Sequence, residues 1–217
     1  MKTQISTRRK HMSIWRISML AVLAGVLQLP MTQATYAQDW YSGLTYDVSF
    51  PAGDLQEFIE DPSWLGVSLT FRKQVDRNVT AGLLFGWQVF SERTGETVQL
   101  ENGAATGTQD RYVNSFPIML NAHYYMGERG NIRPYLGVNA GGLIVLRRYA
   151  IGIVTLDDDS WEWGVTPEIG AVIPINRDTA FLLQGKFTYS FTGEDLAGRD
   201  MKIAYYGISV GFAWQHY

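Results

Sequence analysis

Five charged residues in this chain each stand beside a large apolar residue, as Asp47 does between Tyr46 and Val48. Successive side chains of a strand point to opposite sides, so these charges are expected on one face and the apolar groups on the other. If that face encloses a narrow interior, each charge must be paired or hydrated, because an isolated buried charge is costly. We expect a salt-bridge network that fills the interior, and a small gated, cation-tolerant pore is the alternative. The five residues are Asp47, Arg72, Glu162, Glu168 and Lys186.

Histidine is the other residue type that would suggest catalysis, and the chain has only His11, His123 and His216. Acyl transfer requires a nucleophile, a base and an orienting acid within reach of one another. In an extended strand, His123 shares its face with Asn121 and Tyr125, and no serine follows on that face. We therefore expect His123 to form hydrogen bonds in the interior, and we expect no catalytic residue and no enzymatic activity.

Three consecutive carboxylates, Asp157, Asp158 and Asp159, are the one candidate for metal binding. Hard cations such as calcium take oxygen ligands, but a dedicated calcium loop spaces its ligands two residues apart. Adjacent residues lack this spacing, so a solvated acidic loop tip is favoured over a metal site. No cofactor is expected.

The elements that position these residues show a period of two. In 207–215, large apolar groups alternate with glycine, alanine or polar groups, and the same pattern recurs along the chain. Pro117 and Pro167 interrupt it, and since proline cannot donate to a sheet ladder, each should mark a bulge or a locally unpaired position. The eight predicted strands are 44–50, 65–72, 80–89, 115–124, 135–144, 161–171, 181–191 and 207–215.

The connections between these strands alternate between short and long. Short turns on one side and long, mostly polar loops on the other are typical of barrels that span an outer membrane. The short segments are 75–78, 127–131 and 176–178, and the long segments are 51–63, 92–111, 148–160 and 192–202.

A soluble barrel with its bulky face inward is the main competing fold. The interior of an eight-stranded barrel is only just wide enough for side chains, so four or five large apolar groups per strand would overfill it. A two-sheet sandwich would bury the apolar faces but would not explain the alternating connections. We therefore predict an all-β, eight-stranded, antiparallel, up-and-down transmembrane β-barrel.

The N-terminal 37 residues are predicted to be a cleaved secretory signal. They carry five Lys and Arg and no acidic residue, and the apolar stretch 17–29 is followed by small residues near Ala37. Without them, residues 38–217 carry 13 basic and 21 acidic residues, a net charge of −8. An acidic chain is not expected to bind nucleic acid, and the absence of cysteine excludes disulfides.

Residues 40–217 resemble the small outer-membrane β-barrel family that includes the OmpA transmembrane domain and OmpX. The resemblance is carried by 133–142, by 166–170 and by the C-terminal strand. It implies location in the outer membrane of a Gram-negative bacterium, contact with lipid and lipopolysaccharide, and insertion by the barrel assembly machinery. The assembly signal of the family maps onto Tyr205, Gly207, Val210 and Phe212.

The resemblance specifies architecture better than activity. We expect a monomeric barrel with a structural or surface-interaction role, a closed polar lumen and acidic extracellular loops for a ligand not yet identified. The alternative is a small gated pore or conduit for small solutes.

Overall fold

The computed structural model describes residues 39–94, 97–100, 103–106, 109–151, 154–193 and 201–216. The expected signal peptide, 1–37, lies outside these residues, so its cleavage stays a prediction. Among the described residues, no helix is long and apolar enough to cross a membrane.

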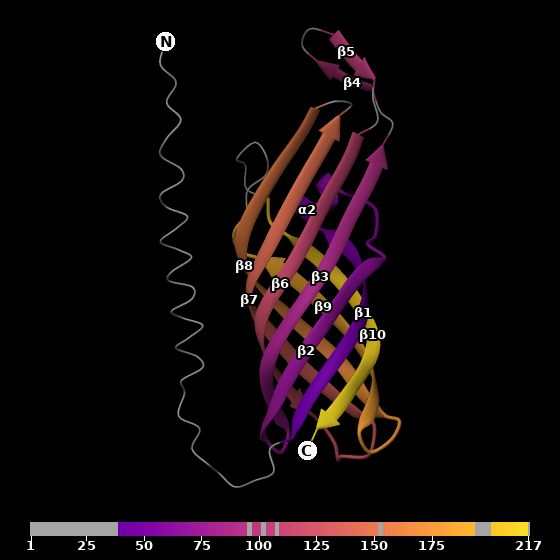
Figure 1. Ribbon diagram of the computed structural model, residues 1–217, viewed down its shortest axis with the longest axis vertical. Helices are drawn as coiled ribbons and strands as arrows, with labels where there is room; N and C mark the ends of the chain where they lie inside the picture. Colours follow the sequence, from indigo (N-terminus) through magenta and orange to yellow (C-terminus); the bar gives the residue numbers. More distant parts are fainter. Residues whose placement is uncertain are drawn as a thin grey trace. The chain divides into compact units, whose positions relative to one another are not determined.

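Eight antiparallel strands close into one barrel, in which β1 pairs with both β2 and the last strand, β10 (Figure 1). The predicted all-β, eight-stranded, up-and-down fold is therefore confirmed. A separate two-stranded sheet consists of β4 (Thr97–Leu100) and β5 (Gly103–Thr106). The barrel strands are β1 (Trp40–Ala52), β2 (Leu65–Asp76), β3 (Val79–Thr94), β6 (Gln109–Tyr125), β7 (Arg133–Ile151), β8 (Val154–Pro174), β9 (Thr179–Ser190) and β10 (Ala204–His216).

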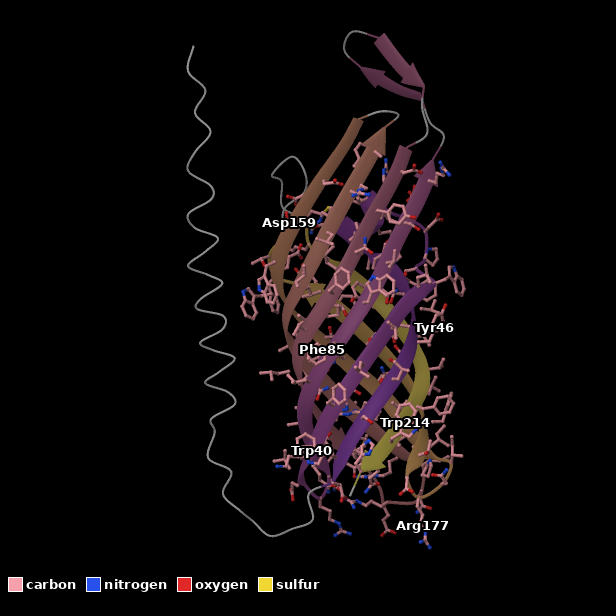
Figure 2. All side chains as sticks on the ribbon, in the orientation of Figure 1. Trp40, Tyr46, Phe85, Asp159, Arg177 and Trp214 are labelled. Carbon is pink, nitrogen blue, oxygen red and sulfur yellow. The ribbon has the colours of Figure 1, made fainter. Side chains whose placement is uncertain are left out.

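Side chains alternate between the two faces of the barrel wall as the sequence predicts. On β10, Ser209 is fully buried, whereas Ile208 and Phe212 keep 56% and 46% of their surface exposed. Figure 2 shows Tyr46 and Phe85 on the outer surface of the wall. The apolar face of each predicted strand is therefore the outer face of the barrel.

Glycine on the inner face permits the close approach of neighbouring strands. A Cβ atom added to Gly82 would overlap the carbonyl oxygen of Phe71, and one added to Gly211 would overlap that of Leu44. A side chain at either position would push two paired strands apart, so the small inner residues serve the tight curvature of the wall.

The two prolines interrupt the sheet ladder locally and leave its register unchanged. Pairing of β3 with β6 skips the positions opposite Phe116 and Pro117, and pairing of β8 with β9 skips Thr166 and Pro167. The expected locally unpaired positions are confirmed.

The connections agree with the prediction at the short-turn end and for the long segments 51–63 and 192–202, which lie between β1 and β2 and between β9 and β10. The short turns lie where expected, because β2 ends at Asp76 and β3 begins at Val79. The long loops 92–111 and 148–160 were predicted wrongly in extent, since β3, β6, β7 and β8 continue into them. Continued strand pairing satisfies the backbone groups there, and Arg148 and Asp157 add a cross-strand ion pair of 2.7 Å.

The long connection after β1 contains a helical turn, α2 (Asp54–Phe58), that folds against the barrel. A carboxylate oxygen of Asp54 accepts a hydrogen bond of 3.0 Å from the backbone N–H of Lys202. Arg111 donates one of 3.0 Å to the carbonyl oxygen of Phe58. These contacts hold the turn so that Leu55 and Ile59 are fully buried.

An apolar cluster fills the interior at the long-loop end, which the expectation of a polar lumen did not include. Phe90 and Tyr205 face each other within it, with ring centroids 5.3 Å apart. At this end, large inward-facing side chains and the connection that contains α2 fill the space that glycine leaves open at other levels of the barrel. The cluster comprises Leu55, Ile59, Leu84, Phe90, Val113, Met119, Leu143, Val145, Met201, Ile203 and Tyr205.

Candidate functional site: the charged interior

Asp47 on β1 and Lys186 on β9 form the central ion pair of the interior. The Lys186 ammonium lies 2.8 Å from the Asp47 carboxylate and donates a second hydrogen bond of 3.1 Å to Ser68. Ser68 donates to one carboxylate oxygen of Asp47, and Thr45 donates to the other at 3.1 Å. Both charges are therefore compensated and hydrogen-bonded, which a buried pair requires for stability.

A second cluster links Arg72 to Glu168 through His123. A guanidinium nitrogen of Arg72 contacts Nδ1 of His123, and Nε2 of the same ring lies 2.7 Å from Glu168. Arginine can only donate, so Nδ1 must accept, and the ring proton then resides on Nε2, facing the carboxylate. Asn139 donates a hydrogen bond of 2.8 Å to the other oxygen of Glu168. His123 is thus a neutral bridge between two opposite charges.

The third pair includes a residue that the sequence analysis missed. Glu162 contacts the guanidinium of Arg147, and both side chains are almost fully buried. Arg147 also donates to the hydroxyl of Ser160 at 2.7 Å. The predicted strand ended at residue 144, but continuing its alternation through Leu143 and Val145 would have placed Arg147 on the inner face.

The five predicted interior charges therefore fall into three separate groups: two ion pairs, one of which Arg147 completes, and the cluster that links Arg72 to Glu168 through His123. The three acidic and three basic side chains of these groups balance one another in charge. A cavity of about 10 Å³ lies beside Asp47 and Lys186, close to the least that can hold one water molecule. The middle of the lumen is packed by these side chains.

The three consecutive carboxylates lie on β8, not in a loop as expected. Asp157 pairs with Arg148 at 2.7 Å, and Asp158 lies 3.9 Å from Arg147. In the part of the chain that the structure describes, no three acidic or histidine side chains are grouped to hold a metal ion.

The residues of the proposed assembly signal occupy both faces of β10. Tyr205 is buried in the apolar cluster, and Gly207 leaves room for the Lys186 side chain. Val210 and Phe212 point outward. Their role in assembly stays a prediction.

No family model and no curated protein matches the chain. Among solved structures, Neisserial surface protein A is 9% identical with a TM-score of 0.50, over 82% of this chain and 97% of that one. OprG of Pseudomonas aeruginosa is 14% identical with a TM-score of 0.49, over 83% and 97%. Outer membrane protein W of E. coli is 15% identical with a TM-score of 0.47, over 84% and 100%.

The closed barrel and this likeness define the class to which the fold belongs. The chain has the fold of the small eight-stranded outer-membrane β-barrels.

Proposed function

We propose that this protein is an integral β-barrel of a Gram-negative outer membrane, with the short turns in the periplasm and the long loops outside. The support is an outer wall covered by large apolar side chains, a surface that would be unusually apolar in water. Aromatic residues gather near both ends of the wall, as interfacial belts do. Near the long-loop end these include Trp163, Phe191 and Tyr206, and near the short-turn end Trp40, Phe212 and Trp214.

The interior is proposed to be closed to ions, and the observation that carries this is the filling of the lumen. Two buried ion pairs and the Arg72–His123–Glu168 cluster lie within it, and the apolar cluster with α2 occupies its long-loop end. A path for hydrated ions would require both fillings to move.

If the lumen is closed, only the external surface of the barrel can contact a ligand. We therefore assign the protein a structural or surface-interaction role without catalysis. The connection 51–63 carries four acidic residues and no basic one. The β7–β8 hairpin adds Asp157 and Asp159, both exposed. Such a surface suits lipopolysaccharide bridged by divalent cations, or a basic extracellular ligand. We further propose a monomer that is inserted by the barrel assembly machinery.

A small gated pore is the second candidate, because a cavity of about 310 Å³ reaches from the short-turn end to Arg72. In this case only the middle and the long-loop end of the lumen would need to open.

Planar-bilayer recording of the refolded chain separates the two candidates. The closed barrel is expected to give no steady single-channel currents at moderate voltage. Reproducible currents from the unmodified chain, with a heat-modifiable folded form as the control for purity, would support the pore.

A further inference from the structure

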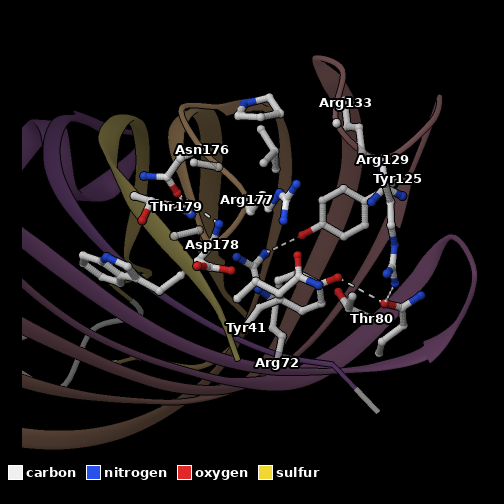
Figure 3. A pocket seen from close by; sticks show the side chains of 18 of the residues that line it. Tyr41, Arg72, Thr80, Tyr125, Arg129, Arg133, Asn176, Arg177, Asp178 and Thr179 are labelled. Carbon is white, nitrogen blue, oxygen red and sulfur yellow. Dashed lines mark hydrogen bonds between the residues drawn. The ribbon is translucent and has the colours of Figure 1, made fainter. Parts of the chain in front are cut away.

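The cavity at the short-turn end has the chemistry of an anion site. It is lined by arginines from four separate segments: β2, the turn after it, the β6–β7 connection with the start of β7, and the β8–β9 connection. Figure 3 shows four of them around the pocket. The five arginines are Arg72, Arg77, Arg129, Arg133 and Arg177.

The carboxylates near this pocket do not balance its arginines. Asp178 lines the cavity, Asp39 lies 2.7 Å from Arg129, and Glu168 reaches Arg72 only through His123. Of the residues that line the cavity, five are arginines and one, Asp178, is acidic, so basic side chains outnumber acidic ones in its wall. Of the five arginines, only Arg129 has a carboxylate of a described residue at ion-pair distance, and the other four have none among the described residues.

Three buried donors in the pocket wall also have no hydrogen-bond acceptor within the described residues. They are Nε of Arg72, Nε of Arg133 and the hydroxyl of Thr80. Arg72 is 2% exposed and Thr80 is 4% exposed, so neither reaches bulk solvent readily. Buried donors are nearly always satisfied in folded proteins, so these donors require an acceptor from a ligand or from water.

Tyr125 holds two of these guanidinium groups in place. Its hydroxyl accepts a hydrogen bond of 3.0 Å from Arg72, and its ring lies 4.8 Å from the guanidinium of Arg133. The donors are therefore positioned before any ligand arrives, which lowers the entropic cost of binding.

We propose that this pocket binds a phosphoryl group, either as a free phosphate or as the headgroup of an anionic phospholipid. Arginine recognises phosphate by paired hydrogen bonds. Donors that approach from four segments suit a tetrahedral group, since a carboxylate offers only two coplanar oxygens. The volume is at the low end for ligand sites, about 300–1,000 Å³, and suits a small anion. The periplasmic location of the pocket rests on the orientation proposed above, whereas the site itself does not depend on that orientation.

Titration calorimetry with inorganic phosphate tests the site, using the folded protein in alkyl maltoside micelles, which carry no phosphate. We expect saturable binding that the double variant Arg133→Gln with Arg177→Gln weakens by about tenfold or more, because charge-assisted hydrogen bonds are lost. The matched control is Arg93→Gln with Arg148→Gln, which removes the same charge from exposed positions at the other end and should leave the affinity unchanged.

A second variant keeps the proposal testable if the first variant fails to fold. Ala213 lines the cavity, so Ala213→Asp places a carboxylate among the arginines and should reduce phosphate binding without removing any of them. Absence of saturable binding, or equal affinity in the wild type and in both pocket variants, would overturn the proposal. If acetate competes with phosphate as well as sulfate does, the assignment to tetrahedral anions is overturned.

Doping the micelles with phosphatidylglycerol identifies the source of the phosphoryl group. Displacement of bound phosphate by the lipid supports a headgroup ligand. Phosphate binding that the lipid leaves unchanged supports a soluble anion.

Discussion

Within the barrel, Asp47 and Glu162 each contact a cationic side chain and Glu168 contacts His123, and these contacts determine what a single substitution does. Asp47, Glu162 and Glu168 are all buried. Removing ions from water is costly, and the attraction between partners compensates for this cost only while both are present. Loss of one partner is therefore expected to cost more than loss of the whole pair.

Lys186→Ala should destabilise the folded barrel because it leaves the Asp47 carboxylate uncompensated. Breaking a buried pair in this way typically costs about 3–5 kcal/mol, and less if water enters. Urea unfolding in lipid vesicles measures the change, and bilayer conductance should rise if water enters the lumen. The control, Arg93→Ala, breaks an ion pair with Asp110 that is largely exposed, and such pairs contribute at most about 1 kcal/mol. Equal stability of both variants would contradict the interior pairing.

The pair that contains Arg147 allows a double-variant test. Arg147→Met alone should destabilise by about 3–5 kcal/mol, whereas Arg147→Met with Glu162→Met should recover most of this loss because no buried charge remains. The same urea titration reports both values. If the two substitutions are additive, Arg147 and Glu162 are not the partners that stabilise each other.

At the scale of the element, β10 shows how one strand separates the outer face of the barrel from its lumen. Phe212 faces outward and packs edge-on against Phe181 of β9, with centroids 5.9 Å apart. Its chain neighbour Ala213 is 7% exposed and faces the arginine-lined cavity. Adjacent residues of one strand therefore lie in opposite surroundings.

Phe212→Asp should lower the yield of inserted barrel, whereas Ala213→Asp should insert nearly as well as the wild type. A charge on the lipid face is penalised according to depth, with Asp costing less than the about 2–4 kcal/mol of Arg or Lys at the midplane. At position 213, the new carboxylate would meet arginines. The folded fraction on unheated gels after refolding into vesicles measures both. The reverse order of yields would show that the faces are assigned wrongly.

At the scale of the whole molecule, the closed sheet and the filled lumen act together. Closure pairs every strand of the barrel on both sides and leaves the barrel without an open sheet edge, which is the condition for a sheet to lie stably in lipid. The filled interior then ties together strands that are not neighbours in the barrel, as Lys186 and Asp47 do.

Export and folding are a prediction that rests on the expected signal peptide and on the barrel. Mature protein is expected to begin near Gln38, to fractionate with outer membranes and to migrate differently on cold and boiled gels. Mass spectrometry of the N-terminus and cell fractionation measure these outcomes. Recovery of the chain in the soluble periplasm, without heat-modifiable migration, would contradict the membrane assignment.

The sequence by itself determined the strands and their faces, because alternation is a local property of the backbone. Residues such as Ile208 and Ser209 need only their neighbours in the chain to be assigned to opposite sides. The local interruption of pairing at the prolines was predictable for the same reason, because the missing N–H of Pro117 is a property of that residue alone.

Only the tertiary structure decided what the inner face contains and which charges meet. Asp47 and Lys186 are 139 residues apart, and closure of the barrel, not local pattern, brings them together. The apolar cluster was missed because Leu55 enters from a connection whose path depends on contacts with Lys202 and Arg111. The arginine-lined pocket likewise depends on three turns that meet only when the strands close into a ring, because side chains distant in sequence share a site only through the fold.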